Sequence, residues 1–88
     1  MEVRMKEELK YTFEQLEEDL GLGHEIEFVY QGEKYSITQT DKGWNIMKFY
    51  DYETLQIFNN VMDLLKDARI KSKQLKDIWV DVEVTTIF

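Results

Sequence analysis

The chain has 88 residues, a formal net charge of −7, and neither cysteine nor proline. Its hydrophobic content of 43% and aromatic content of 14% are too high for a disordered chain, and its length fits one small domain, residues 1–88. The lack of cysteine excludes disulfides, cysteine zinc sites and thiol catalysis. No apolar run approaches the roughly 20 residues of a membrane span, and the first residues lack the apolar stretch of a signal peptide. We therefore expect a cytoplasmic protein with no membrane contact.

The first 20 residues have the apolar spacing of a helix. Apolar side chains recur at steps of four, four, three and four residues, at Met5, Leu9, Phe13, Leu16 and Leu20. This spacing is typical of the buried stripe of an amphipathic helix. We expect one helix from about Glu2 to Leu20, with Gly21 as its left-handed C-cap.

From residue 25 the apolar period changes to two, which indicates strands. The expected buried side chains of the first two strands are Ile26, Phe28, Tyr30, Tyr35 and Ile37. Turns are expected at residues 31–32 and 40–43, where Gly32 and Gly43 stand. Residues 44–50 are apolar on both faces, which predicts a central third strand.

The second half of the chain predicts two short helices and a closing strand. Residues 51–58 are ambiguous, and we favour a short irregular strand. Asn59 or Asn60 is the expected N-cap of a helix that buries residues 61, 64, 65 and 68, and Ser72 is the expected cap of a second helix. The alternation of Val80, Val82 and Val84 with acids predicts a strand at the end. The fold class is thus α+β: an N-terminal helix, a three- to four-stranded antiparallel meander and two short C-terminal helices.

The sequence offers few groups for catalysis or metal binding. His24 is the only histidine, and with Glu25 or Glu27 it would make an incomplete metal site. A serine nucleophile would have to be Ser36, in an expected strand, or Ser72, an expected cap. Gly21 and Gly23 follow a helix rather than a strand, so they do not form a phosphate loop. We expect no enzyme, no cofactor and no metal.

Acidic residues concentrate near the start of the chain. Residues 1–33 hold ten acids and three bases. Their net charge of −7 equals the net charge of the whole chain. Acids at the C-terminal end of a helix oppose its dipole at about 0.3–1 kcal/mol each, and here no base offsets them. The candidate protein-binding residues are Glu7, Tyr11, Glu14 and Glu18 on one outward stripe, Glu17 and Asp19 beside it, and Glu25 and Glu27 in the next strand.

Two interpretations of these acids stay open. They form either a solvated surface that keeps the protein soluble, or a docking surface that presents carboxylates in place of nucleic-acid phosphates to a basic groove. In the second case Tyr50 and Tyr52 are candidate anchors of the contact, with core packing as their alternative.

A basic segment, residues 66–76, supports interpretations that compete with the acidic docking surface. It holds five bases and one acid. Direct nucleic-acid binding is disfavoured because a chain of charge −7 repels a polyanion. The segment fits a structural or regulatory homodimer in which acidic and basic patches meet.

The motifs of residues 23–84 resemble small acidic proteins of Firmicute prophages and mobile elements. The matching segments are GHEIEF at 23–28, KYSI at 34–37, GW at 43–44 and the stretch from Leu75 to Glu83. The resemblance implies a bacterial host cell and supplies no catalytic residue. In length, acidity and element order the chain also resembles, as a class, the DNA-mimicking type II anti-CRISPR proteins, without a shared motif. The resulting expectation is a non-enzymatic inhibitor that blocks a nucleic-acid-binding host protein such as the CRISPR effector Cas9.

Overall fold

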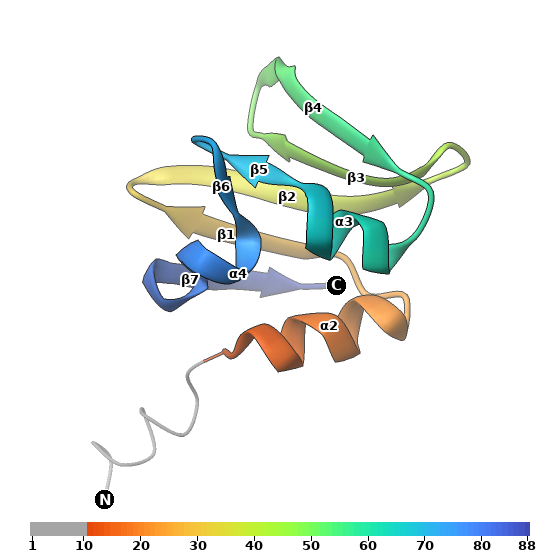
Figure 1. Ribbon diagram of the computed structural model, residues 1–88, viewed down its shortest axis with the longest axis horizontal. Coiled ribbons are helices and arrows are strands. Elements are labelled where there is room, and N and C mark those ends of the chain that lie inside the picture. The colour runs from red at the N-terminus through yellow and green to blue at the C-terminus, as the bar shows by residue number, and fades with distance from the viewer. Residues whose placement is uncertain (1–10) are drawn as a thin grey trace, which may run out of the picture.

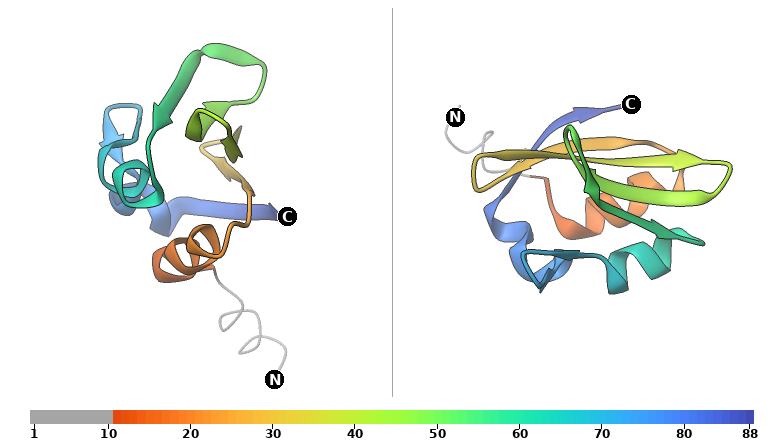
Figure 2. Two further views of the ribbon diagram at one scale, coloured as in Figure 1. Left: turned by 90° about the vertical axis from the view of Figure 1, so that its right-hand side faces the viewer. Right: turned by 90° about the horizontal axis from the view of Figure 1, so that it is seen from above.

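A computed structural model describes residues 11–88, and its centre is a five-stranded antiparallel sheet (Figure 1). The strands of the sheet are β1 (Ile26–Tyr30), β2 (Glu33–Thr40), β3 (Gly43–Lys48), β4 (Asp51–Phe58) and β7 (Val82–Ile87). Their order is β4-β3-β2-β1-β7, so β4 and β7 form the edges. The helices are α2 (Phe13–Gly21), α3 (Val61–Asp67) and α4 (Leu75–Ile78). They lie against one face of the sheet, and no helix of residues 11–88 lies on the other, as the right-hand view of Figure 2 shows.

Helix α2 begins later than the apolar spacing predicts. Thr12 is its N-cap: the Thr12 hydroxyl accepts a 3.0 Å hydrogen bond from the backbone N–H of Gln15, and the Gln15 side chain accepts one of 2.8 Å from the N–H of Thr12. This capping box fixes an extended residue in front of the helix. The prediction of one continuous helix from Glu2 to Leu20 is therefore wrong at Thr12. Met5, Leu9 and the other residues of 1–10 lie outside the described part of the chain.

The end of α2 also differs from the prediction. Gly21 is the last helical residue, and Leu22, with φ −87°, is the C-cap. The left-handed conformation expected at Gly21 occurs two residues later, at Gly23, whose φ is 93°. The extra residues carry the chain from the helical layer up to β1.

The first three strands agree with the alternating pattern. Ile26, Phe28 and Tyr30 of β1 are buried, as are Tyr35 and Ile37 of β2. Strand β3 lies between β2 and β4, as the two-sided apolar pattern of residues 44–50 predicts. The expected α+β class, with an N-terminal helix and an antiparallel sheet, is confirmed.

The sheet is larger than the predicted meander. Residues 51–58 form a full eight-residue strand, β4, which pairs with β3 through an irregular register between Ile46 and Lys48. The final strand β7 pairs antiparallel with β1 and makes a fifth strand. The sequence pattern predicts β7 as a strand, but it does not reveal this partner because the pairing joins residues more than 50 positions apart.

The segment between α3 and β7 contains one further correction. Asn60 is the N-cap of α3 and accepts a 2.8 Å hydrogen bond from the N–H of Asp63. Ser72 caps no helix: with φ 71° it lies in the turn between β5 (Arg69–Ile70) and β6 (Lys73–Gln74). Helix α4 follows Gln74 and leads through a 3-10 turn, η1 (Trp79–Asp81), into β7.

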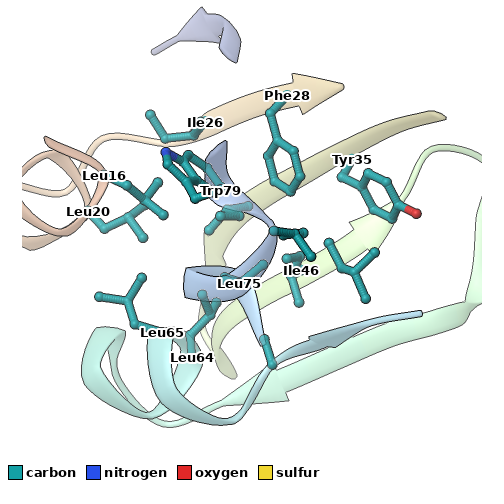
Figure 3. Packing of buried hydrophobic residues seen from close by; sticks show 14 of the residues in the cluster. Leu16, Leu20, Ile26, Phe28, Tyr35, Ile46, Leu64, Leu65, Leu75 and Trp79 are labelled. Atoms are coloured by element: carbon teal, nitrogen blue, oxygen red, sulfur yellow. The ribbon is translucent and has the colours of Figure 1, made fainter. Parts of the chain in front are cut away.

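Trp79 joins the helical layer to the sheet in the core shown in Figure 3. Its ring centroid lies 5.3 Å from that of Phe28 and 6.1 Å from that of Phe13. Its Nε1 donates a 3.2 Å hydrogen bond to the carbonyl oxygen of Tyr11. The start of α2 is thereby fixed against the sheet. No helix within residues 11–88 is long and apolar enough to cross a membrane.

Candidate functional site

The sheet face opposite α2, α3 and α4, which no helix of the described residues covers, is called the open face below. It brings together three of the predicted site residues. Glu27 of β1 is the Cα partner of Ser36, and Ser36 is the partner of Met47. Partners across antiparallel strands project on the same side of a sheet. Because the neighbours of Glu27, Ile26 and Phe28, point into the core, this row of side chains lies on the open face.

A shallow hollow of about 360 Å³ lies on the open face. Its lining consists of one carboxylate, two hydroxyls, a thioether and three aromatic rings: Glu27, Ser36, Thr38, Met47, Phe49, Tyr50 and Tyr52. Tyr50 and Tyr52 are 95% and 81% exposed, so their interpretation as core residues is wrong. Phe49 is half-buried and meets Tyr50 edge to face at 5.9 Å. The predicted acid and the predicted aromatic anchors therefore share one concave surface.

Tyr50 has a strained backbone. It lies in the two-residue turn between Lys48 and Asp51, with φ 64°. A bulky residue seldom adopts this left-handed conformation. Such strain occurs preferentially at binding and catalytic positions.

Glu83 is a second acid of the open face. It is exposed on β7 and is the Cα partner of Val29, the residue two positions beyond Glu27. The sequence places Glu83 opposite Val82 and Val84 but does not place it near Glu27, because that requires the β1–β7 pairing. Ser36 and Thr38 alternate with buried residues in the sequence, and this pattern could have predicted the polar side chains in the middle of the open face.

The acids of α2 lie in the helical layer, on the other side of the sheet. Glu14, Glu17 and Glu18 are exposed, and none of them forms an ion pair within residues 11–88. Glu17, however, lines a groove with Lys66 and Lys76 of the basic segment. The acidic helix and the basic segment are thus neighbours in one chain, a compensation that the sequence does not reveal.

Two other predicted residues of this region face inward. Tyr11 precedes the helix, so its expected place on an outward helical stripe is wrong. Its hydroxyl donates a 2.5 Å hydrogen bond to the Asp19 carboxylate, and its ring lies 6.4 Å from Trp79. Burial, together with the hydrogen bond to Asp19, raises the pKa of Tyr11 above its usual value. Both side chains therefore support the fold. Glu7 lies outside the described residues.

Glu25 and His24 also have partners within the chain. The Glu25 carboxylate accepts a 2.9 Å hydrogen bond from the backbone N–H of Gln39, which holds the end of β2. His24 Nδ1 lies 2.9 Å from the carbonyl oxygen of Phe88. Within residues 11–88, no three histidine, aspartate or glutamate side chains gather into a candidate metal site.

A smaller cleft of about 200 Å³ lies beside β3 on the helical side and is occupied at its rim by ion pairs. Glu33 contacts Lys48 at 3.2 Å and Lys71 at 3.5 Å. Burial, with Glu33 nearby, raises the pKa of Tyr35 to about 12, and the hydrogen bond from Lys48 lowers the pKa of Glu33. These contacts join β2, β3 and the β5–β6 hairpin.

Comparison of the chain with protein-family models, curated proteins and solved structures gave no match.

Proposed function

We propose that this protein acts without catalysis, by binding another protein. Its target is a nucleic-acid-binding host protein, such as a CRISPR effector, whose cationic groove it occupies and thereby inhibits. The observation that carries the proposal is the open face, where the Glu27 carboxylate and the exposed rings of Tyr50 and Tyr52 line one hollow. Exposed aromatic anchors beside a charge are typical of the energetic centre of protein interfaces.

The charge of the molecule supports a cationic partner. The chain carries −7, and Glu83 adds a second acid to the open face, in the same cross-strand row as the base Lys34. A basic groove that normally holds phosphates gains the same kind of electrostatic attraction from carboxylates as from DNA. The exposed acids of α2 add to the long-range field, although they lie on the other layer.

The composition of the hollow favours binding over catalysis. Glu27 is the only ionisable carboxylate in its lining, which contains no histidine, lysine or second acid. General acid–base chemistry usually needs two groups with different protonation states. The hollow is open and shallow, whereas substrate pockets usually enclose most of a small ligand.

A pull-down from bacterial lysate, with and without competing double-stranded DNA, tests the proposed function. We expect the protein to retain a nucleic-acid-binding protein and to release it when DNA is added, because both compete for one groove. The E27Q/E83Q variant is the matched control and should retain less. Retained proteins that DNA does not displace would contradict the proposal.

The exposed edge strand β4 favours a second candidate, a structural or regulatory homodimer. Leu55 and Ile57 are exposed on this edge, and no lysine or proline blocks pairing with another strand. The sequence suggests that the acidic and basic patches of two copies meet. In the structure Glu17 and Lys66 line one groove, so these patches are already neighbours within one chain. Light scattering at low and high salt distinguishes the candidates: an edge-paired dimer persists at both, a charge-dependent dimer weakens with salt, and a monomer at both excludes the dimer.

A further inference from the structure

We propose that the hollow on the open face binds an arginine side chain of the partner, with the guanidinium between the Glu27 carboxylate and the rings of Tyr50 and Tyr52. This inference rests on the proposed function, because it names the group of the partner that the docking surface recognises. It requires a hollow that attracts a cation, accepts a planar group and is not filled by the chain itself.

The lining of the hollow attracts cations. Glu27 supplies the only full charge, and the three rings of Phe49, Tyr50 and Tyr52 present faces that attract positive charge. The thioether of Met47 and the hydroxyls of Ser36 and Thr38 add polarizable and hydrogen-bonding groups without a positive charge. An anion in this place would meet the Glu27 carboxylate, and the nearby base Lys34 lies outside the lining, over the Phe49 ring.

A cation already occupies one ring of the cluster from outside the hollow. The Nζ of Lys34 lies 5.1 Å from the centroid of the Phe49 ring. Lys34 is not part of the lining, so the faces of Tyr50 and Tyr52 stay available. Within residues 11–88 this cluster thus makes a cation–π contact at Phe49 and none at Tyr50 or Tyr52.

Arginine fits the hollow better than lysine. A guanidinium is planar, stacks on aromatic rings and forms two parallel hydrogen bonds with one carboxylate. An ammonium is compact and more strongly hydrated; it can lie over a ring, as that of Lys34 does, but it forms neither a planar stack nor two parallel hydrogen bonds. The combination of one carboxylate with two exposed rings therefore selects the planar cation, which is also the side chain that commonly lines phosphate-binding grooves.

The backbone conformation of Tyr50 supports the same inference. Its φ of 64° is unfavourable, its side chain is 95% exposed, and its ring contacts only the edge of Phe49 among the aromatic pairs. The fold gains little from this side chain. The strained conformation is therefore consistent with a binding role for the Tyr50 ring, which lines the hollow.

Nuclear magnetic resonance titration of the full chain with Nα-acetyl-arginine amide tests the inference. We expect saturable shifts of the ring signals of Tyr50 and Tyr52. The neutral isostere Nα-acetyl-citrulline amide should give none, and the lysine analogue should bind about threefold more weakly or worse. Equal shifts for arginine and citrulline, or shifts confined to α2, would overturn the inference.

Three variants sharpen this test. Glu27→Gln and Tyr52→Thr should each weaken arginine binding by about threefold or more. Asp67→Asn removes the same charge from the exposed end of α3 and should change binding by less than about 1.5-fold. Equal weakening by Glu27→Gln and Asp67→Asn would show a general charge effect and would overturn the proposed site.

The inference and the proposed function fail differently. If arginine amide binds in the hollow but no DNA-displaceable protein is retained from lysate, the site stands and the proposed function is wrong. If such a protein is retained equally by the wild type and by Glu27→Gln and Tyr52→Thr, the function stands and the arginine site is wrong.

Discussion

Tyr50 is the residue whose local conformation is hardest to explain by folding alone. Three other described residues with side chains have positive φ, Gln31, Lys71 and Ser72, and like Tyr50 they all lie in turns. Two of these are tied to each other, because Lys71 Nζ donates a 2.9 Å hydrogen bond to the side-chain oxygen of Gln31. Within residues 11–88 the side chains of Tyr50 and Ser72 make no hydrogen bond, and the large ring of Tyr50 meets only the ring of Phe49 among the aromatic pairs. This difference supports a binding role for its exposed ring.

Tyr50→Gly should separate stability from binding. Glycine adopts a left-handed φ without steric cost, so the free energy of unfolding should stay the same or rise by up to about 1 kcal/mol. Affinity for the arginine probe should fall, because one ring of the hollow is lost. Chemical denaturation and the titration measure the two effects. A loss of stability beyond about 1 kcal/mol would mean that the ring supports the fold.

Glu33 gives a pH-dependent prediction at the same scale. The hydrogen bond and charge of Lys48 lower the pKa of Glu33 below its usual value. A carboxyl with a lowered folded-state pKa stabilises the protein above its unfolded-state pKa, and this contribution disappears as pH falls through the folded-state value. The stability difference between wild type and Glu33→Gln should therefore be larger at pH 7 than at pH 3. A difference independent of pH would contradict this role of the Glu33 charge.

Gly43 controls how the β2–β3 turn meets the end of β4. Its φ is 123°, and a Cβ at this position would overlap the carbonyl oxygen of Phe58. Gly32, in the β1–β2 turn, also has a positive φ of 77°, but nothing lies within 4 Å of the position of its Cβ. The two glycines share the conformational requirement and differ in the close approach of a backbone.

Gly43→Ala should therefore destabilise the protein more than Gly32→Ala. We expect a loss of about 2–4 kcal/mol for the first, from backbone conformation plus overlap with Phe58, and about 1 kcal/mol for the second, from conformation alone. Thermal or chemical unfolding of both variants measures the comparison. Equal losses would show that the Phe58 carbonyl moves away at little cost.

An element could be predicted from the sequence when the residues that determine it are close together in the chain. Strands β1 to β3 could be predicted because alternating burial and adjacent turns are written in consecutive residues. The start of α2 was also predictable, because Thr12 and Gln15 have the spacing of a capping box, but the longer apolar repeat concealed it. Strand β4 was obscured by its irregular pairing with β3 at Ile46–Lys48, which breaks the alternation.

At the scale of the whole molecule, the sheet divides the predicted acidic surface. Acids that are close in sequence, such as Glu18 and Glu27, lie on opposite layers because the chain passes from the helical layer into β1 between them. The sequence predicts that acids and the two tyrosines form one binding surface, and among the predicted acids within residues 11–88 the fold brings Glu27 alone into the hollow with the tyrosines. Which acids would share a surface depended on long-range pairing, including β1 with β7, that no local pattern encodes.

We propose that the open face, rather than α2, contacts a cationic partner. The most direct test measures the affinity of the DNA-displaceable partner for two double variants, E27Q/E83Q and E14Q/E18Q. Both change the net charge from −7 to −5, so they differ only in where the carboxylates are lost. The account predicts that E27Q/E83Q binds about tenfold more weakly than the wild type and that E14Q/E18Q binds within about twofold of it. Weakening by E14Q/E18Q that equals or exceeds that of E27Q/E83Q would contradict the account and return the docking surface to the helix.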